Sequence, residues 1–133
     1  MPAPIYASKE FVAHFFTTDV VESRPIAWEI ALHTQSPGTG DLWEVDETSY
    51  ARSDVTFNKY EDPEARGFWE AQNTADVTFP AALAGESYTV THYTVRDKTN
   101  GECLAIAALE VPIPVVEGTV VTVPATFMKV RGI

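Results

Sequence analysis

The stretch YTVTHYTVRDKTNGECLAIAALEV, residues 88–111, decides the fold that the sequence predicts. Its first half is rich in Thr, Val and Tyr, the residue types that favour β-strands. DKTNG at residues 97–101 follows as a turn, in which Asn100 and Gly101 suit the positive φ angles of a hairpin. The apolar run ECLAIAALEV then returns. We therefore predict a β-hairpin whose second strand is apolar enough to be central in a sheet.

The tetrapeptide DVTF occurs twice, at residues 54–57 within SYARSDVTF and at residues 76–79 within TADVTFP. Alternation of polar and apolar residues is typical of a strand with one buried face, so Val and Phe should point inward. Between the two copies, residues 58–72 are polar and contain Pro63 and Gly67, which indicates a long loop. We interpret the two copies as neighbouring strands of one sandwich.

Other segments add short strands. Residues 42–46, LWEVD, are predicted to form one of them, after the Pro- and Gly-rich loop QSPGTGD. PIPVVEG at 112–118 should be an edge strand or connector, because proline cannot donate a ladder hydrogen bond. Residues 119–130 form the last predicted strand, bent at Pro124. Residues 26–34 alternate with period two, and their apolar side chains point one way: Ile26, Trp28, Ile30 and Leu32.

One helix is predicted, over residues 8–16 (SKEFVAHFF), with Ser8 as N-cap and a broad apolar face that includes Phe11 and Phe15. A helix this short is not stable alone, so it should pack on the rest of the chain. The sequence therefore predicts an all-β fold, an antiparallel β-sandwich of jelly-roll or Ig-like type with one short N-terminal helix. Residues 1–25 would form an arm and helix on a sandwich of residues 26–133, together one compact domain.

Composition limits the possible functions. The chain has 133 residues and a formal charge of −10, which argues against binding to nucleic acid or to an anionic membrane and suits either solubility or docking on a basic partner surface. Cys103 is the single cysteine, so no internal disulfide is possible, and its apolar surroundings predict a core residue. The N-terminus lacks the pattern of a secretory signal, and no apolar run is long enough for a membrane helix. We expect a soluble, reduced protein.

Candidate catalytic and metal sites are weak. His14, His33 and His92 are far apart in the sequence, without the short spacing of zinc ligands. The acidic stretch DLWEVDET, residues 41–48, could supply oxygen ligands to calcium but lacks the spacing of an EF-hand loop. Carboxylate pairs such as Glu44 with Asp54 are expected by chance among 19 acidic residues, and no Gly-x-Ser-x-Gly motif occurs. We expect no enzyme activity, no metal and no cofactor.

The ordered set SYAR…VTF…VTFP…VTH, together with AWEIALHTQSPGTGDLWEV at residues 27–45, resembles small virion proteins of tailed bacteriophages. These proteins are labelled tail fibre-like or minor structural proteins. The resemblance implies a non-enzymatic structural protein of the virion, made in the cytoplasm of the host bacterium. It leaves a tail-associated fibre or adaptor, a capsid decoration or cement protein, and a carbohydrate-binding module of a receptor-binding fibre as alternatives.

The chain departs from the family pattern in two places. The segment 58–72 is longer and more acidic than expected, and the last strand is basic where the family tends to be neutral.

Trp28 alternates with core residues and should be buried, whereas aromatic residues among charges are typical of interface anchors. Trp43 could also fold under the sandwich. The partners implied are other phage structural proteins of tail or capsid, with self-association into a homo-oligomer as a further possibility. The predicted contact residues are Tyr60, Phe68, Trp69, Trp43, Lys129 and Arg131.

Overall fold

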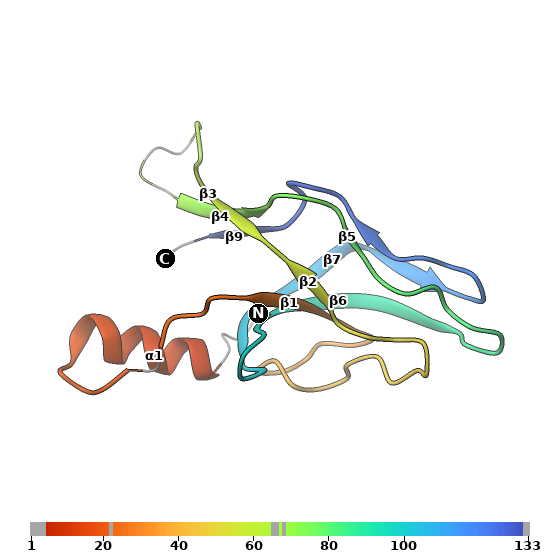
Figure 1. The fold of residues 1–133 in the computed structure, drawn as a ribbon, viewed down its shortest axis with the longest axis horizontal. Coiled ribbons are helices and arrows are strands. Elements are labelled where there is room, and N and C mark those ends of the chain that lie inside the picture. The colour runs from red at the N-terminus through yellow and green to blue at the C-terminus, as the bar shows by residue number, and fades with distance from the viewer. Residues whose placement is uncertain (1–4, 22, 65–66, 68, 132–133) are drawn as a thin grey trace.

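The computed structural model describes residues 5–21, 23–64, 67 and 69–131. Figure 1 shows helix α1 projecting at one end of a body made of β-strands. The helix spans Ile5–Phe16. The strands are β1 (Trp28–His33), β2 (Ser53–Val55), β3 (Phe57–Glu61), β4 (Trp69–Asn73), β5 (Val77–Thr78), β6 (Tyr88–Asp97), β7 (Cys103–Val115), β8 (Thr122–Val123) and β9 (Lys129–Arg131).

The strands form three antiparallel sheets within the described residues. The largest has the order β2-β1-β6-β7, the second β3-β4-β9, and the third pairs β5 with β8. Ile30 and Leu32 of β1 share one buried cluster with Val77 of β5 and Val123 of β8, so different sheets enclose a common core. The predicted all-β sandwich with one short helix is confirmed.

The β6–β7 hairpin predicted from residues 88–111 is present. β6 spans all of Tyr88–Asp97, and Gly101 closes the turn at a φ of 76°. The central position predicted for the second strand is wrong, since β7 lies at the edge of its sheet. The edge position explains how β7 contains Pro112 and Pro114, because the outer side of an edge strand needs no amide donors.

Both DVTF copies face the core as predicted. Val55, Val77 and Phe79 are buried and Phe57 is half-buried, while the Asp and Thr residues of both copies are exposed. The two strands also lie close together, since the Ser53 hydroxyl donates to the carbonyl oxygen of Thr78 at 2.8 Å. They belong to different sheets, however, because β2 pairs with β1 and β5 pairs with β8.

Three local predictions are wrong. Residues 58–72 are not a long loop: β3 and β4 pair antiparallel, with Phe57 opposite Asn73 and Glu61 opposite Trp69. This hairpin is polar because much of it faces solvent. The strand predicted at 42–46 is only one isolated bridge, between His33 and Glu44. The final strand is divided at the predicted Pro124 bend into β8 and β9, which join different sheets.

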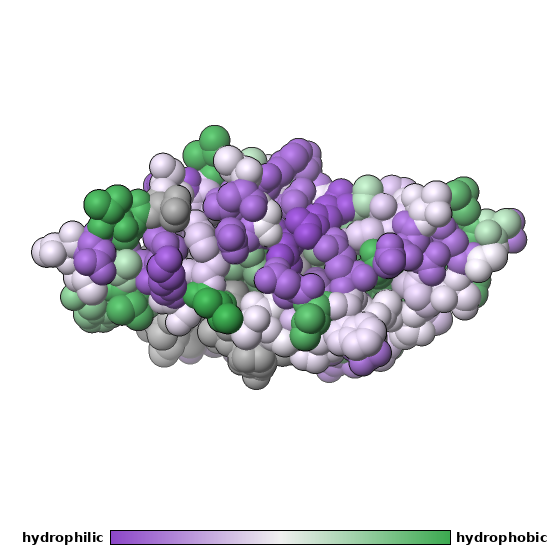
Figure 2. Space-filling model, turned by 90° about the horizontal axis from the view of Figure 1, so that it is seen from below, coloured by the Kyte–Doolittle hydropathy of each residue, from purple (hydrophilic) through white to green (hydrophobic). Residues whose placement is uncertain are grey.

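Helix α1 begins at Ile5, so Ser8 lies within it and the predicted N-cap is wrong. None of its residues is buried, although it contacts β7 and the Asn100 side chain donates to the Tyr6 hydroxyl at 3.4 Å. Figure 2 shows apolar residues gathered at the end of the molecule that α1 forms. In the described part of the chain, no helix has the length and hydropathy to cross a membrane.

Candidate interaction surfaces

The β3-β4-β9 sheet presents two different faces, and its first face is aromatic. Trp28 and Phe57 are in edge-to-face contact there, with ring centres 6.3 Å apart. Trp69 lies beside them, 46% exposed, and the Lys59 Nζ atom is 5.0 Å from the centre of its ring. This distance is within the range of a cation–π interaction. The face therefore offers a half-exposed aromatic surface with one cation on it.

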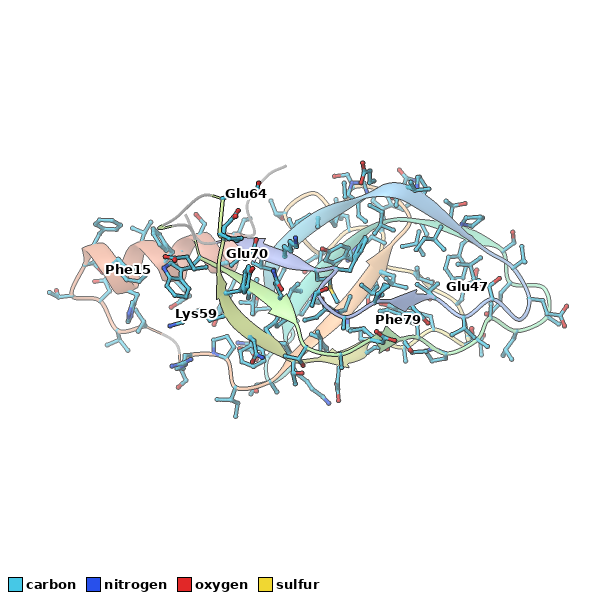
Figure 3. All side chains as sticks on the ribbon, turned by 90° about the horizontal axis from the view of Figure 1, so that it is seen from above. Phe15, Glu47, Lys59, Glu64, Glu70 and Phe79 are labelled. Carbon is cyan, nitrogen blue, oxygen red and sulfur yellow. The ribbon has the colours of Figure 1, made fainter. Side chains whose placement is uncertain are left out.

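The opposite face of the same sheet is polar. Tyr60 pairs with Glu70, and Gln72 pairs with Lys129, so these four side chains lie on one side. Together with Asp62, Pro63, Glu64 and Thr126 they line a cavity of about 500 Å³. The Glu70 side chain is nearly buried and accepts a hydrogen bond from Gln72 Nε2 at 3.0 Å. Figure 3 shows Lys59, Glu64 and Glu70 on this hairpin, away from Phe79 and Glu47.

A third exposed aromatic residue, Trp43, lies in the 34–46 segment that follows β1. Its backbone φ is 61°, a left-handed value that is unfavourable for a bulky side chain. Hydrogen bonds on both sides hold it there: the Thr34 amide donates to the Trp43 carbonyl at 3.0 Å, and the Val45 amide donates to the Leu32 carbonyl at 2.9 Å. The Trp43 side chain is 55% exposed, so the expectation that it folds under the sandwich is wrong.

The 34–46 segment is anchored by a buried polar network on the outer side of the largest sheet. His33 Nδ1 donates to the Leu42 carbonyl at 2.7 Å, and the Thr94 hydroxyl lies 2.9 Å from His33 Nε2. Arg96 donates to Thr94, to the carbonyl of Gly40 at 2.7 Å and to the Asp41 carboxylate. Burial lowers the pKa of His33, so the ring stays neutral and accepts from Thr94.

The SYAR motif anchors the other end of this segment. Arg52 donates two hydrogen bonds to Glu44, at 2.9 and 2.8 Å, and one to Glu29 at 3.0 Å. The Tyr50 hydroxyl donates to Glu44 at 2.7 Å and accepts from the Leu32 amide at 3.0 Å. Burial raises the pKa of Glu44, but the hydrogen bonds from Arg52 and Tyr50 outweigh it and hold that pKa below its usual value. The motif is therefore structural.

The acidic stretch 41–48 does not gather as a calcium site. Asp41 is paired with Arg96 and Glu44 with Arg52, so both carboxylates are already neutralised by guanidinium groups. Among the described residues, no group of three or more His, Cys, Asp or Glu side chains is placed to hold a metal ion. Cys103 is buried as predicted, and burial raises the pKa of its thiol.

Comparison with protein families identifies the chain. The model of the family described as Podophage GP4 fiber I protein gp80 matches residues 3–131, which include α1 and every strand among the described residues. The chain belongs to this family. It is a bacteriophage fibre protein of the virion, and the predicted resemblance to tail fibre-like proteins of tailed phages is confirmed. No curated protein matches the chain.

The fibre protein brings together only part of the contact set predicted from its sequence. Tyr60 and Lys129 share the polar face of the β3-β4-β9 sheet, with Arg131 opposite Glu70 in the register of β9. Trp69 lies on the aromatic face of the same sheet, and Trp43 is on a separate segment beside the largest sheet. Phe68 lies outside the described residues.

Sequence reasoning missed two parts of these surfaces. Phe57 was expected only as a core residue, yet it extends the aromatic face next to Trp69. Glu70 was not noticed at all, although it is the most buried carboxylate of the polar cavity. Once residues 58–72 are interpreted as a hairpin, the sequences FNKYE and WEAQN assign successive side chains to opposite faces of a sheet. This alternation is the sequence signal that could have found both residues.

Proposed function

We propose that this fibre protein is a non-enzymatic structural subunit associated with the phage tail, which docks on other virion proteins. The observation that carries the proposal is the half-exposed aromatic face of the β3-β4-β9 sheet in a member of a phage fibre family. Large aromatic side chains at the centre of a surface patch are typical anchors of protein interfaces. Trp69, supported by Lys59, is the anchor on this face, and the rigidly held Trp43 is a second one.

Charge narrows the class of partner. The chain carries 19 acidic and nine basic residues, so its summed field attracts a basic surface. A basic virion partner would be steered onto the acidic sandwich, while the aromatic anchors would supply the apolar contact. Such docking weakens as salt rises, because ionic screening removes the attraction.

The proposal is tested in phage particles that carry Trp69→Glu in this gene. Incorporation of the protein into purified virions is measured by quantitative mass spectrometry against the major capsid protein. We expect Trp69→Glu to lower incorporation by about tenfold or more, since each 1.4 kcal/mol of lost affinity is a factor of ten. Thr89→Glu, at an exposed position of β6, is the matched control and should incorporate normally. Normal incorporation of Trp69→Glu contradicts docking through this face.

The same measurement separates the tail from the capsid. A tail-associated protein is present in far fewer copies than the major capsid protein, whereas a decoration or cement protein approaches the capsid protein in copy number. A copy number close to that of the capsid protein overturns the tail placement and favours capsid decoration, the alternative left open by the sequence.

One observation favours a second candidate, a carbohydrate-binding module of a receptor-binding fibre. The cavity on the polar face combines the half-exposed ring of Tyr60 with carboxylate and amide groups, a combination that can stack on a sugar ring and bind its hydroxyl groups. Binding to a glycan array that is abolished by Tyr60→Ala and retained in Trp69→Ala supports this candidate. An array without binding eliminates it.

A further inference from the structure

β7 is the longest strand in the described part of the chain, and it lies at the edge of its sheet. It spans Cys103–Val115 and pairs with β6 alone among the described strands. The outer side of β7 therefore has no strand partner within the described residues. The opposite edge of the sheet is different, because β2 has only three residues and its Ser53 hydroxyl donates to the Thr78 carbonyl of β5. A long unpaired edge is a template for pairing with another chain.

The register of the β6–β7 hairpin shows which backbone groups of β7 point outward. The Asp97 amide donates to the Glu102 carbonyl at 2.9 Å, so the backbone groups of Asp97 point toward β7. These directions alternate along an antiparallel strand. The backbone groups of Val95 therefore also point toward β7, whereas those of Thr94 point toward β1.

Two residues of β7 direct their amides and carbonyls away from the sheet. Ala105 lies opposite Val95 and hydrogen-bonds to β6, whereas Ile106 lies opposite Thr94 and has its backbone groups on the outer side. Ala108, two residues further along, has the same orientation as Ile106 and is exposed. This part of the edge can thus both donate and accept ladder hydrogen bonds.

The far end of β7 cannot pair in this way. Pro114 lies opposite Thr89 and has no amide to donate, and Pro112 precedes it by two residues with the same orientation. Prolines at such positions protect an edge from a second chain. At the other end, Leu104 lines a groove with α1. Between these limits, residues 105–110 contain no proline and form what we call the open edge of β7.

Charge indicates which partner fits the open edge. Residues 99–128 contain Glu102, Glu110 and Glu117 and no lysine, arginine or histidine. Glu102 and Glu110 are both exposed, and every residue between them is apolar. A strand with apolar residues between basic ends complements this pattern, since opposite charges on neighbouring strands stabilise their pairing. The β7 edge of a second copy carries the same carboxylates, so it lacks the required cations.

We propose that the open edge of β7 is a docking site for an extended segment of another virion protein, apolar in its middle and basic at its ends, which adds to the sheet as a further strand. In this mode main-chain hydrogen bonds give affinity, and alternate side chains give specificity. The proposal rests on the proposed docking function and gives it a second contact. The contact is distinct from the Trp69 face, because β7 and β4 belong to different sheets.

The first test is Ala108→Pro, with incorporation into purified virions measured as for Trp69→Glu. This variant removes an outward amide, as Pro112 and Pro114 do naturally, and leaves the hydrogen bonds to β6 in place. We expect incorporation to fall by about tenfold or more. Ala108→Val keeps the amide at the same exposed position and should incorporate normally. Circular dichroism and urea denaturation of the purified proteins verify that both variants fold. Equal incorporation of the two variants overturns the proposal.

A second test concerns the charge of the partner and does not depend on the folding of a proline variant. Glu110→Lys places a cation on the open edge and should lower incorporation by about fivefold or more, since it repels the basic ends of the added strand. Glu117→Lys makes the same change of charge at an exposed position after β7, and should incorporate normally. Equal incorporation of these two variants overturns the basic partner.

Comparison with Trp69→Glu separates the two contacts. Normal incorporation of Trp69→Glu together with exclusion of Ala108→Pro overturns docking through the aromatic face and supports the open edge. The reverse result overturns the open edge alone. Sedimentation equilibrium of the purified full-length protein tests the other occupant: a wild-type dimer that Ala108→Pro abolishes overturns the basic partner in favour of a second copy, and a monomer supports a different chain.

Discussion

Gly40 approaches Cys103 so closely that a β-carbon on Gly40 would lie 2.5 Å from the Cys103 Sγ atom. The φ of Gly40, 127°, is also one that only glycine adopts without strain. Gly40 lies in the segment that presents Trp43, and its carbonyl accepts from Arg96. The contact therefore ties the position of that exposed segment to the start of β7.

We predict that Gly40→Ala destabilises the fold by about 2–4 kcal/mol, because both the clash and the backbone strain must be relieved. Adding Cys103→Ala should recover only a small part of the loss: it removes the Sγ atom, but the Cys103 Cβ atom stays 2.6 Å from the added carbon, and the strained φ remains. Gly85→Ala is the matched control: its φ is 85°, but nothing lies within 4 Å of its added carbon, so the cost should be smaller. Urea denaturation measures all four proteins. Equal effects of Gly40→Ala and Gly85→Ala would show that the contact with Cys103 is unimportant.

The buried His33 predicts a loss of stability in acid. Burial lowers the pKa of His33 in the folded state below its unfolded value of 6.5. The unfolded chain therefore binds a proton first, and stability that is complete above about pH 6.5 is lost as the pH falls through that value toward the folded pKa. His33→Gln should reduce this slope between about pH 7 and pH 5.5, as measured by urea denaturation. His14→Gln, on the exposed helix, serves as the control, and an unchanged slope in His33→Gln refutes the assignment.

The Arg52–Glu44 pair predicts that the SYAR motif, residues 49–52, contributes to the stability of the fold. Arg52→Ala leaves the half-buried Glu44 without its two guanidinium hydrogen bonds, at a cost of about 1–2 kcal/mol after allowance for solvent screening. Arg52→Lys keeps the charge but not the two-pronged geometry, so it should be intermediate. Lys98→Ala removes an exposed pair with Asp54 and should leave the denaturation midpoint unchanged. If Arg52→Ala and Lys98→Ala behave alike, the partly buried pair has no special role.

The hydrogen bonds of Asn73 predict that its substitution weakens the structure locally, next to the last strand, β9. Its side chain donates to the carbonyls of Ala75 and Pro124, at 3.0 and 2.8 Å, and accepts from the Met128 amide at 2.9 Å. Asn73→Ala leaves these buried groups unpaired, and we expect a loss of about 2–4 kcal/mol. Hydrogen exchange should show the Met128 amide losing its protection first. Asn58→Ala, at an exposed position of β3, is the control, and equal protection in both variants would count against the role of Asn73.

The parts of the fold that the sequence predicted are those with a local signal. Strand β6 and its turn follow from β-forming residues and Asn100-Gly101, and the inward Val and Phe of both DVTF copies follow from alternation. The β3–β4 hairpin could not be predicted in this way because few of its residues are apolar. Its strands gain stability from pairing with β9, which lies more than fifty residues further along the chain.

The candidate surfaces were less predictable for a related reason. His33 of β1 and Arg96 of β6 occupy polar positions that alternate with apolar ones, so the sequence predicts that they face solvent. The 34–46 segment folds over them and buries both. Whether a polar face is covered depends on a tertiary contact that periodicity does not record. The same limitation applies to Trp43, whose exposure depends on how this segment is anchored.

The pairing of strands distant in the sequence has a consequence for how the chain folds as it is synthesised. The β6–β7 hairpin joins strands that are neighbours in the sequence, and hairpins of this kind form within microseconds. The β1–β6 and β4–β9 pairs instead join strands that lie far apart in the sequence. Such non-local pairing places folding on the millisecond-to-second scale. A nascent chain on the ribosome therefore cannot complete the β3-β4-β9 sheet, or the hydrogen bond between Asn73 and the Met128 amide, until Lys129–Arg131 have left the exit tunnel.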